Sequence, residues 1–168
     1  MKITESLKRK VNFVVIEKGT VNQQICCPLR KAWVAATPEE WVRQRLLQQM
    51  LGPLAYPRGL LAVEVSLREM PHLRLARGRL PRRRADILCY STKSSGVPLL
   101  LIECKATPLD SKVIRQATSY NFHVGAQYVA VVNQEQQQLG WYDLMKQEYR
   151  FHTGFPAYEV LLSRVTAD

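Results

Sequence analysis

Two carboxylates and a lysine, Asp86, Glu103 and Lys105, have the types and the spacing that suit hydrolytic chemistry. Asp86 lies near the start of the apolar segment 84–90, and the other two lie at the end of the apolar segment 99–105. Neighbouring carboxylates repel each other unless a cation offsets their charge. Mg²⁺ or Mn²⁺ would do so, would activate a bound water and would hold phosphate oxygens. The pattern therefore predicts metal-dependent phosphodiester hydrolysis assisted by Lys105.

Strand geometry gives these side chains a way to meet. The sequence STKSSGVP at 91–98 is typical of a turn, so the two apolar segments are expected to be antiparallel neighbours. The start of one strand then lies beside the end of the other, and alternation puts Glu103 and Lys105 on one face. The backbone carbonyl of Cys104 would add a third metal ligand to Asp86 and Glu103. The alternative is an ordinary strand that ends in E-x-K as it enters solvent.

Polar residues on two expected helices could complete this site. Gln116 and Tyr120 are four residues apart, so they project from the same helix face and could overhang the metal. Glu40, on an earlier helix, is a weaker candidate metal ligand. It also stands three residues after Thr37, where it suits a capping box equally well. Plain helix surface is the alternative for Gln116 and Tyr120.

The charge of the chain favours a polyanionic partner. Lysine and arginine total 24 against 14 aspartates and glutamates, a net charge of +10. Arginines crowd the segment before Asp86, at Arg68, Arg74, Arg77, Arg79, Arg82, Arg83 and Arg84. Contacts to nucleic acid are expected from Arg43, Arg82, Arg83, Arg84 and Arg115. The alternative is a solvated loop whose arginines point outward.

Hydrophobic patterning predicts an α/β fold with a central mixed β-sheet flanked by helices. Helices are expected from Pro38 to a stop at Gly52, and from Ser111 to a stop at Gly125. The main strands are expected at 60–67, 84–90, 99–105 and 127–132, and weaker ones at 139–143 and 149–152. Before them, a strand is expected at 11–16 and irregular or short-strand structure at 21–34. The turns between the first three main strands indicate an antiparallel meander, and the second helix indicates a parallel crossover.

Length and composition favour one domain over 1–168, with its core at about 25–143 and peripheral segments at 1–24 and 156–168. The chain has no apolar run of membrane-spanning length and no signal-peptide pattern, so we expect it in the cytoplasm. Its four cysteines have neither zinc-ligand spacing nor a disulfide framework, and buried reduced thiols are the better interpretation.

Several segments together resemble the N-terminal domain of the type I restriction enzyme R subunit, in a stand-alone form. They are CPLRKAWVAATPEEWVRQRLLQQML, YP at 56–57, RRRADILCY, PLLLIECKA, QATSYN and YVAVVN, in this order. The resemblance implies a PD-(D/E)xK nuclease fold. It implies that Asp86 and Glu103 are metal ligands and that Lys105 is the catalytic lysine. It also implies that Gln116 and Tyr120 form a Q-x-x-x-Y motif beside the active site, and that Glu40 is a first-helix glutamate brought to the metal.

These observations predict a Mg²⁺-dependent or Mn²⁺-dependent endonuclease that acts on DNA. No GxxxxGK[ST] phosphate loop occurs, so we expect the chain by itself not to be an ATP-driven restriction subunit. A catalytically inactive module of the same fold, binding nucleic acid or a protein, is the alternative. RNA is a weaker candidate, because the chain shows no basic–aromatic interleaving for base stacking. A homodimer would supply two active sites for cutting both strands.

Overall fold

The computed structural model describes residues 14–17, 20–73 and 81–164. Its strands are β1 (Val14–Glu17), β2 (Thr20–Cys27), β3 (Ala32–Ala35), β4 (Leu61–Ser66), β5 (Arg84–Tyr90), β6 (Pro98–Cys104), β7 (Tyr128–Val132), β8 (Gln137–Asp143) and β9 (Glu148–Thr153). Its α-helices are α2 (Pro38–Leu51), α3 (Ser111–Val124) and α4 (Tyr158–Arg164). Short 3-10 turns occupy Arg58–Leu60, Leu67–Glu69 and Pro71–Leu73.

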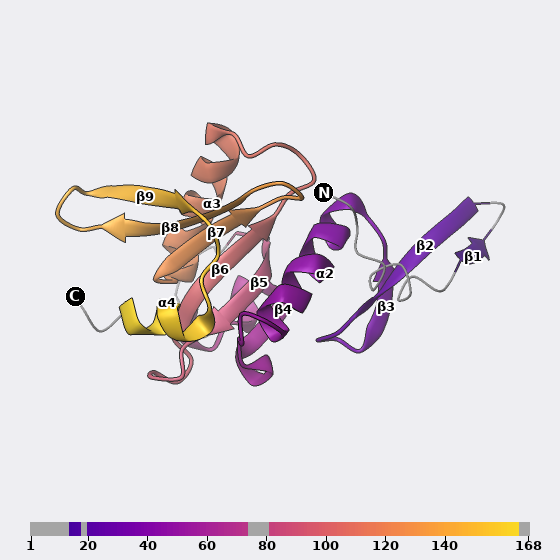
Figure 1. The fold of residues 1–168 in the computed structure, drawn as a ribbon, viewed down its shortest axis with the longest axis horizontal. Coiled ribbons are helices and arrows are strands. Elements are labelled where there is room, and N and C mark those ends of the chain that lie inside the picture. Colours follow the sequence, from indigo (N-terminus) through magenta and orange to yellow (C-terminus); the bar gives the residue numbers. More distant parts are fainter. Residues whose placement is uncertain (1–13, 18–19, 74–80, 165–168) are drawn as a thin grey trace.

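A six-stranded mixed sheet forms the centre of the molecule, in the order β4-β5-β6-β7-β8-β9 (Figure 1). Strands β4, β5 and β6 are antiparallel neighbours, which confirms the expected meander. Strand β7 runs parallel to β6, and α3 makes the crossover between them, as predicted. Strands β8 and β9 then add an antiparallel hairpin at the edge. The mixed α/β architecture expected from the sequence is therefore confirmed.

Helices cover both faces of this sheet. On one face α2 and α4 pack through Leu46, Leu47 and Leu161 against Ile87 and other buried strand residues. On the other face α3 packs against a second cluster. That cluster contains Leu67, Met70, Ala85, Leu88, Leu101, Ala117, Tyr120, Val124, Ala126, Val129 and Val131. Strand β6 is buried along its whole length, because both of its faces are covered.

The ends of the two main helices follow the predicted signals. The Thr37 hydroxyl accepts a hydrogen bond from the Glu40 amide at the start of α2. The Asp110 carboxylate caps α3 by accepting from the Val113 amide. Gly125 ends α3 with φ 72°, a left-handed conformation that glycine adopts without a Cβ penalty. Asp110 and Gly125 thus fix where α3 begins and ends in the crossover from β6, which carries Glu103, to β7.

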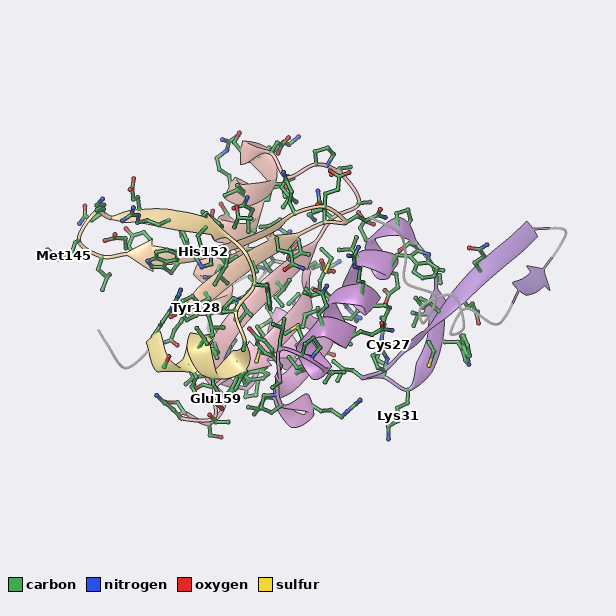
Figure 2. The ribbon with its side chains drawn as sticks, in the orientation of Figure 1. Cys27, Lys31, Tyr128, Met145, His152 and Glu159 are labelled. Carbon is green, nitrogen blue, oxygen red and sulfur yellow. The ribbon has the colours of Figure 1, made fainter. Side chains whose placement is uncertain are left out.

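The two ends of the described chain are more ordered than the sequence indicated. Residues 21–34, expected to be irregular or short-strand structure, contain most of β2 and β3, which pair antiparallel around the turn that carries Lys31 (Figure 2). At the other end, α4 falls in a segment that we expected to be peripheral. Its Tyr158 and Leu161 are buried in the core, because α4 returns across the sheet face that α2 covers.

Two further expectations concern the whole chain. Cys26, Cys27, Cys89 and Cys104 are all free thiols, and all but Cys26 are buried. Among the residues that the structure describes, no helix is long and apolar enough to cross a membrane.

A carboxylate centre where two strands diverge

Strands β5 and β6 separate at the position of the two predicted metal-binding carboxylates. Their ladder runs as far as the pair Ile87 and Ile102, and the pairing does not continue to Asp86 and Glu103. The Asp86 Oδ2 atom instead accepts a hydrogen bond of 2.7 Å from the Cys104 amide. A strand amide points along the plane of its sheet, so Asp86 lies between the strands rather than on one face. This divergence puts Asp86 beside the E-x-K segment.

Glu103 is the more deeply buried of the two carboxylates, with 3% of its surface exposed. Its Oε2 atom forms ion pairs with Arg83 Nη2 at 2.7 Å and with Lys105 Nζ at 3.4 Å. Its Oε1 atom is buried and has no hydrogen-bond partner among the described residues. A buried carboxylate oxygen without a partner is costly, and a bound cation would satisfy it.

The surroundings of Glu103 oppose its ionisation. Burial raises the pKa of Glu103, and the nearby charge of Asp86 raises it further, while Arg83 and Lys105 act in the opposite direction. Asp86 and Glu103 are thus close enough to repel each other electrostatically. Such a site favours an additional positive charge between the two carboxylates.

We expect Glu103→Gln to stabilise the metal-free protein at pH 8, raising Tm by roughly 2–4 °C, a shift of about 1 kcal/mol in a domain of this size. Because the folded-state pKa is raised, ionising Glu103 costs stability as the pH rises through that value. The cost is absent below the ordinary pKa of 4.5, so the advantage of the variant should shrink toward that pH. Thermal unfolding followed by circular dichroism at several pH values measures it. A variant less stable than wild type at pH 8 would show that the ion pairs of Glu103 outweigh its burial.

Arg43 forms ion pairs with three carboxylates, those of Glu40, Glu64 and Asp86. This arginine is buried, with 5% of its surface exposed, and its Nη2 atom lies 2.7 Å from Asp86 Oδ1. Its Nη1 atom forms ion pairs with Glu40, at 2.7 Å, and with Glu64. Burial alone would lower the pKa of Arg43, but Asp86 and Glu40 raise it above the ordinary value. Arg43 therefore stays charged and holds Asp86 in place.

Glu40 forms part of the predicted capping box and also belongs to a buried ion network. Its amide completes half of the predicted capping box, but its carboxylate turns inward to Arg43, Arg30 and Gln44. It reaches Asp86 only through Arg43, which lies between them. As a result, Glu40 supports Asp86 from α2 by binding Arg43.

Sequence reasoning missed Glu64, which lies opposite Asp86 on β4. Glu64 has φ 55°, a left-handed conformation that is uncommon for a residue with a side chain. The β4–β5 ladder skips this position, pairing Val63 with Ile87 and Val65 with Ala85. This local irregularity turns Glu64 toward Arg43. The only sequence signal was a charged residue inside an otherwise apolar strand.

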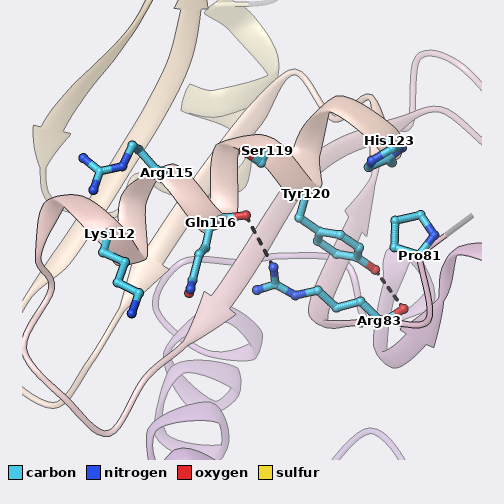
Figure 3. A pocket seen from close by; sticks show the side chains of 8 residues that line it. All are labelled: Pro81, Arg83, Lys112, Arg115, Gln116, Ser119, Tyr120 and His123. Carbon is cyan, nitrogen blue, oxygen red and sulfur yellow. Dashed lines mark hydrogen bonds between the residues drawn. The ribbon is translucent and has the colours of Figure 1, made fainter.

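The Q-x-x-x-Y pair contacts Arg83 (Figure 3). Arg83 in turn forms an ion pair with Glu103. Tyr120 is buried, its hydroxyl donates to the Arg83 carbonyl at 3.2 Å, and the Arg83 guanidinium lies 4.7 Å from the centre of its ring. Burial and the charge of Glu103 raise the pKa of Tyr120 to about 12, so this hydroxyl remains a donor. Gln116 has an exposed side chain, and its backbone carbonyl accepts from Arg83 at 3.4 Å.

The arginines proposed to contact nucleic acid fall into two groups. Arg82, Arg84 and Arg115 are exposed, and Arg83 is partly exposed beside Glu103. Arg43 is a correction: it is buried and bound to carboxylates, so its guanidinium is not presented to a phosphate. Arg74, Arg77 and Arg79 lie outside the described residues.

The residues present fit a divalent cation held by two carboxylates and one carbonyl. Among the described residues, no group of three or more His, Cys, Asp or Glu side chains is placed to hold a metal ion. Asp86 and Glu103 would supply two oxygens and the Cys104 backbone carbonyl a third, which leaves positions for water on a hard cation. The Oε1 atom of Glu103, which is buried and has no partner in the described part of the chain, is the observation that supports this fit.

The chain forms an α/β domain consistent with a nuclease-like fold. It has a mixed sheet, helices on both faces of that sheet, and carboxylates where two strands diverge. The chain belongs to the family described as type I restriction enzyme R protein N terminus, whose model matches residues 38–156. The match runs from the start of α2 to just beyond β9 and includes the whole carboxylate centre. No curated protein and no solved structure matches the chain.

Proposed function

We propose that this protein is a metal-dependent nuclease of the PD-(D/E)xK type that hydrolyses phosphodiester bonds in DNA. The observation that carries the proposal is the geometry at the divergence of β5 and β6. There Asp86 accepts from the Cys104 amide and Lys105 pairs with Glu103, and one buried oxygen of Glu103 has no partner among the described residues. The net charge of +10 and the restriction-enzyme family support DNA as the substrate.

Each residue of the centre has a distinct task in this reaction. Asp86 and Glu103 hold Mg²⁺ or Mn²⁺, and Arg43 fixes the carboxylate of Asp86. When bound there, the metal would supply Lewis acidity that lowers the pKa of a water molecule and offsets charge on the phosphate. Lys105, partly exposed and 3.4 Å from Glu103, orients the attacking water or stabilises negative charge that develops on the phosphate.

The direct test is DNA cleavage by the purified protein. We expect wild type to cut DNA with Mg²⁺ or Mn²⁺ and not with EDTA, and we expect Asp86→Asn to lose this activity. The substitution keeps the size of the side chain and removes the charge that holds the metal. Cleavage that continues unchanged in Asp86→Asn would contradict the proposal, and a panel of duplex DNA, single-stranded DNA and RNA identifies the substrate.

A second candidate is a binding module of the same fold that performs no hydrolysis. The specific observation in its favour is that cations already occupy both carboxylates: Arg43 pairs with Asp86, and Arg83 with Glu103. Calorimetry with Mn²⁺ separates the two candidates. If the protein is a nuclease, wild type should bind Mn²⁺ and Glu103→Ala should not. If Mn²⁺ affinity is the same in both proteins, the binding module is favoured.

A further inference from the structure

A hollow of about 360 Å³ lies beside the carboxylate centre, between α3 and the residues that lead into β5 (Figure 3). Four basic side chains line it, from Arg83, Lys112, Arg115 and His123. None of the eight described residues that line the hollow is acidic. Its chemistry therefore suits an anion.

The hollow follows one side of α3. Lys112, Gln116 and Tyr120 are spaced by four residues, so they form a stripe along the helix. Figure 3 shows Lys112 and Gln116 pointing to the side of α3 on which the Arg83 guanidinium lies. In the part of the chain that the structure describes, neither Lys112 nor Arg115 forms an ion pair with a carboxylate. Their positive charges are thus available to a ligand.

Arg83 belongs to both the hollow and the carboxylate centre. One end of its guanidinium lies 2.7 Å from Glu103 Oε2, while the other makes only a long contact of 3.4 Å with the Gln116 carbonyl. A guanidinium bound to a carboxylate is a strong, charge-assisted contact. A divalent cation on Glu103 would compete with this contact and would leave Arg83 free to turn toward the hollow.

We propose that the hollow is a phosphate subsite for the DNA strand next to the phosphodiester being cut, and that Arg83 joins it when Glu103 takes a divalent cation. This inference rests on the proposed function. Before metal binds, Arg83 offsets the charge of Glu103; afterwards it contacts a DNA phosphate together with Lys112, which points to the same side of α3 (Figure 3). Since coupling between two ligands is reciprocal, metal and DNA then strengthen each other's binding.

The test separates phosphate binding from metal binding. Fluorescence anisotropy with a labelled DNA duplex in EDTA, repeated at several salt concentrations, reports phosphate contacts. We expect Lys112→Gln to weaken DNA binding about fivefold and to reduce the salt slope by about one, as for the loss of one phosphate contact. Lys146→Gln, an exposed lysine in the turn between β8 and β9, is the matched control and should change neither value.

The coupling has its own measurements. Calorimetry without DNA should show that Arg83→Gln binds Mn²⁺ about fivefold more tightly than wild type, because a competing cation is gone. DNA binding with Mn²⁺, measured in a Lys105→Ala background to prevent cleavage, should instead be weaker once Arg83→Gln is added. A single substitution thus changes the two affinities in opposite directions, which a general loss of structure would not do.

Each part of the inference can be overturned separately. If Lys112→Gln binds DNA like Lys146→Gln, or if wild type binds no duplex, the hollow is not a phosphate subsite. If Arg83→Gln binds Mn²⁺ no more tightly than wild type, Arg83 does not compete with metal. If Mn²⁺ binding is unchanged in Glu103→Ala, the proposed function is contradicted instead. The salt dependence of DNA binding by Lys112→Gln is measured in EDTA, so that result does not depend on the metal site.

Discussion

Replacing Lys105 with alanine is expected to slow Mg²⁺-dependent DNA cleavage by on the order of 10²–10⁴-fold, the usual effect of losing a positioned acid–base or charge-stabilising group. Lys105 lies 3.4 Å from Glu103 and is partly exposed, so its loss leaves both carboxylates in place. Metal binding by calorimetry should therefore not weaken, while single-turnover cleavage falls. A variant that cuts at the wild-type rate would remove Lys105 from the chemistry.

A control variant and a conservative variant test what Lys105 contributes to cleavage. Lys146→Ala removes an exposed lysine in the turn between β8 and β9 and should leave cleavage unchanged. Lys105→Arg keeps the positive charge but cannot release a proton, because an arginine side chain stays protonated in proteins. Activity retained by Lys105→Arg would assign the lysine to charge stabilisation, whereas loss of activity would assign it to handling the proton or position of the water.

Replacing Arg43 with methionine is expected to lower the free energy of unfolding by about 3–5 kcal/mol, the usual cost of removing one partner from a buried ion network. Arg43 pairs with Glu40, Glu64 and Asp86, and the first of these is itself buried. Without the guanidinium, these negative charges repel one another in a space with little water. Equilibrium unfolding in urea, followed by circular dichroism, measures the loss.

A matched pair of variants tests whether burial is the cause. Arg150 forms an exposed ion pair with Asp143 at 3.6 Å, so Arg150→Met should cost less than about 1 kcal/mol. Adding Glu40→Gln to Arg43→Met removes one of the unpaired charges and should recover part of the lost stability. If Arg43→Met is as stable as Arg150→Met, the network does not hold this part of the fold together.

The order of elements followed from local patterns in the chain. Apolar runs separated by turn residues predicted β4 to β7, and the caps at Thr37 and Gly125 predicted where α2 begins and where α3 ends. These signals act over a few residues, so they can be recognised without the fold. The same patterns indicated that Asp86 would lie near Glu103, because a turn between two antiparallel strands brings their distant ends together.

The partners of those carboxylates could be known only from the tertiary structure. Arg43 reaches Asp86 from a helix far away in the sequence, and periodicity on α2 does not tell whether an arginine faces solvent or a buried carboxylate. Residue alternation also does not reveal that the β5–β6 ladder ends at Ile87, so that Asp86 lies between the strands. The ion pairs of a long charged side chain depend on which opposite charges the fold brings within its reach, and sequence spacing does not reveal this. Residue types in the chain thus indicated the carboxylate centre, while packing decided which cations stabilise it.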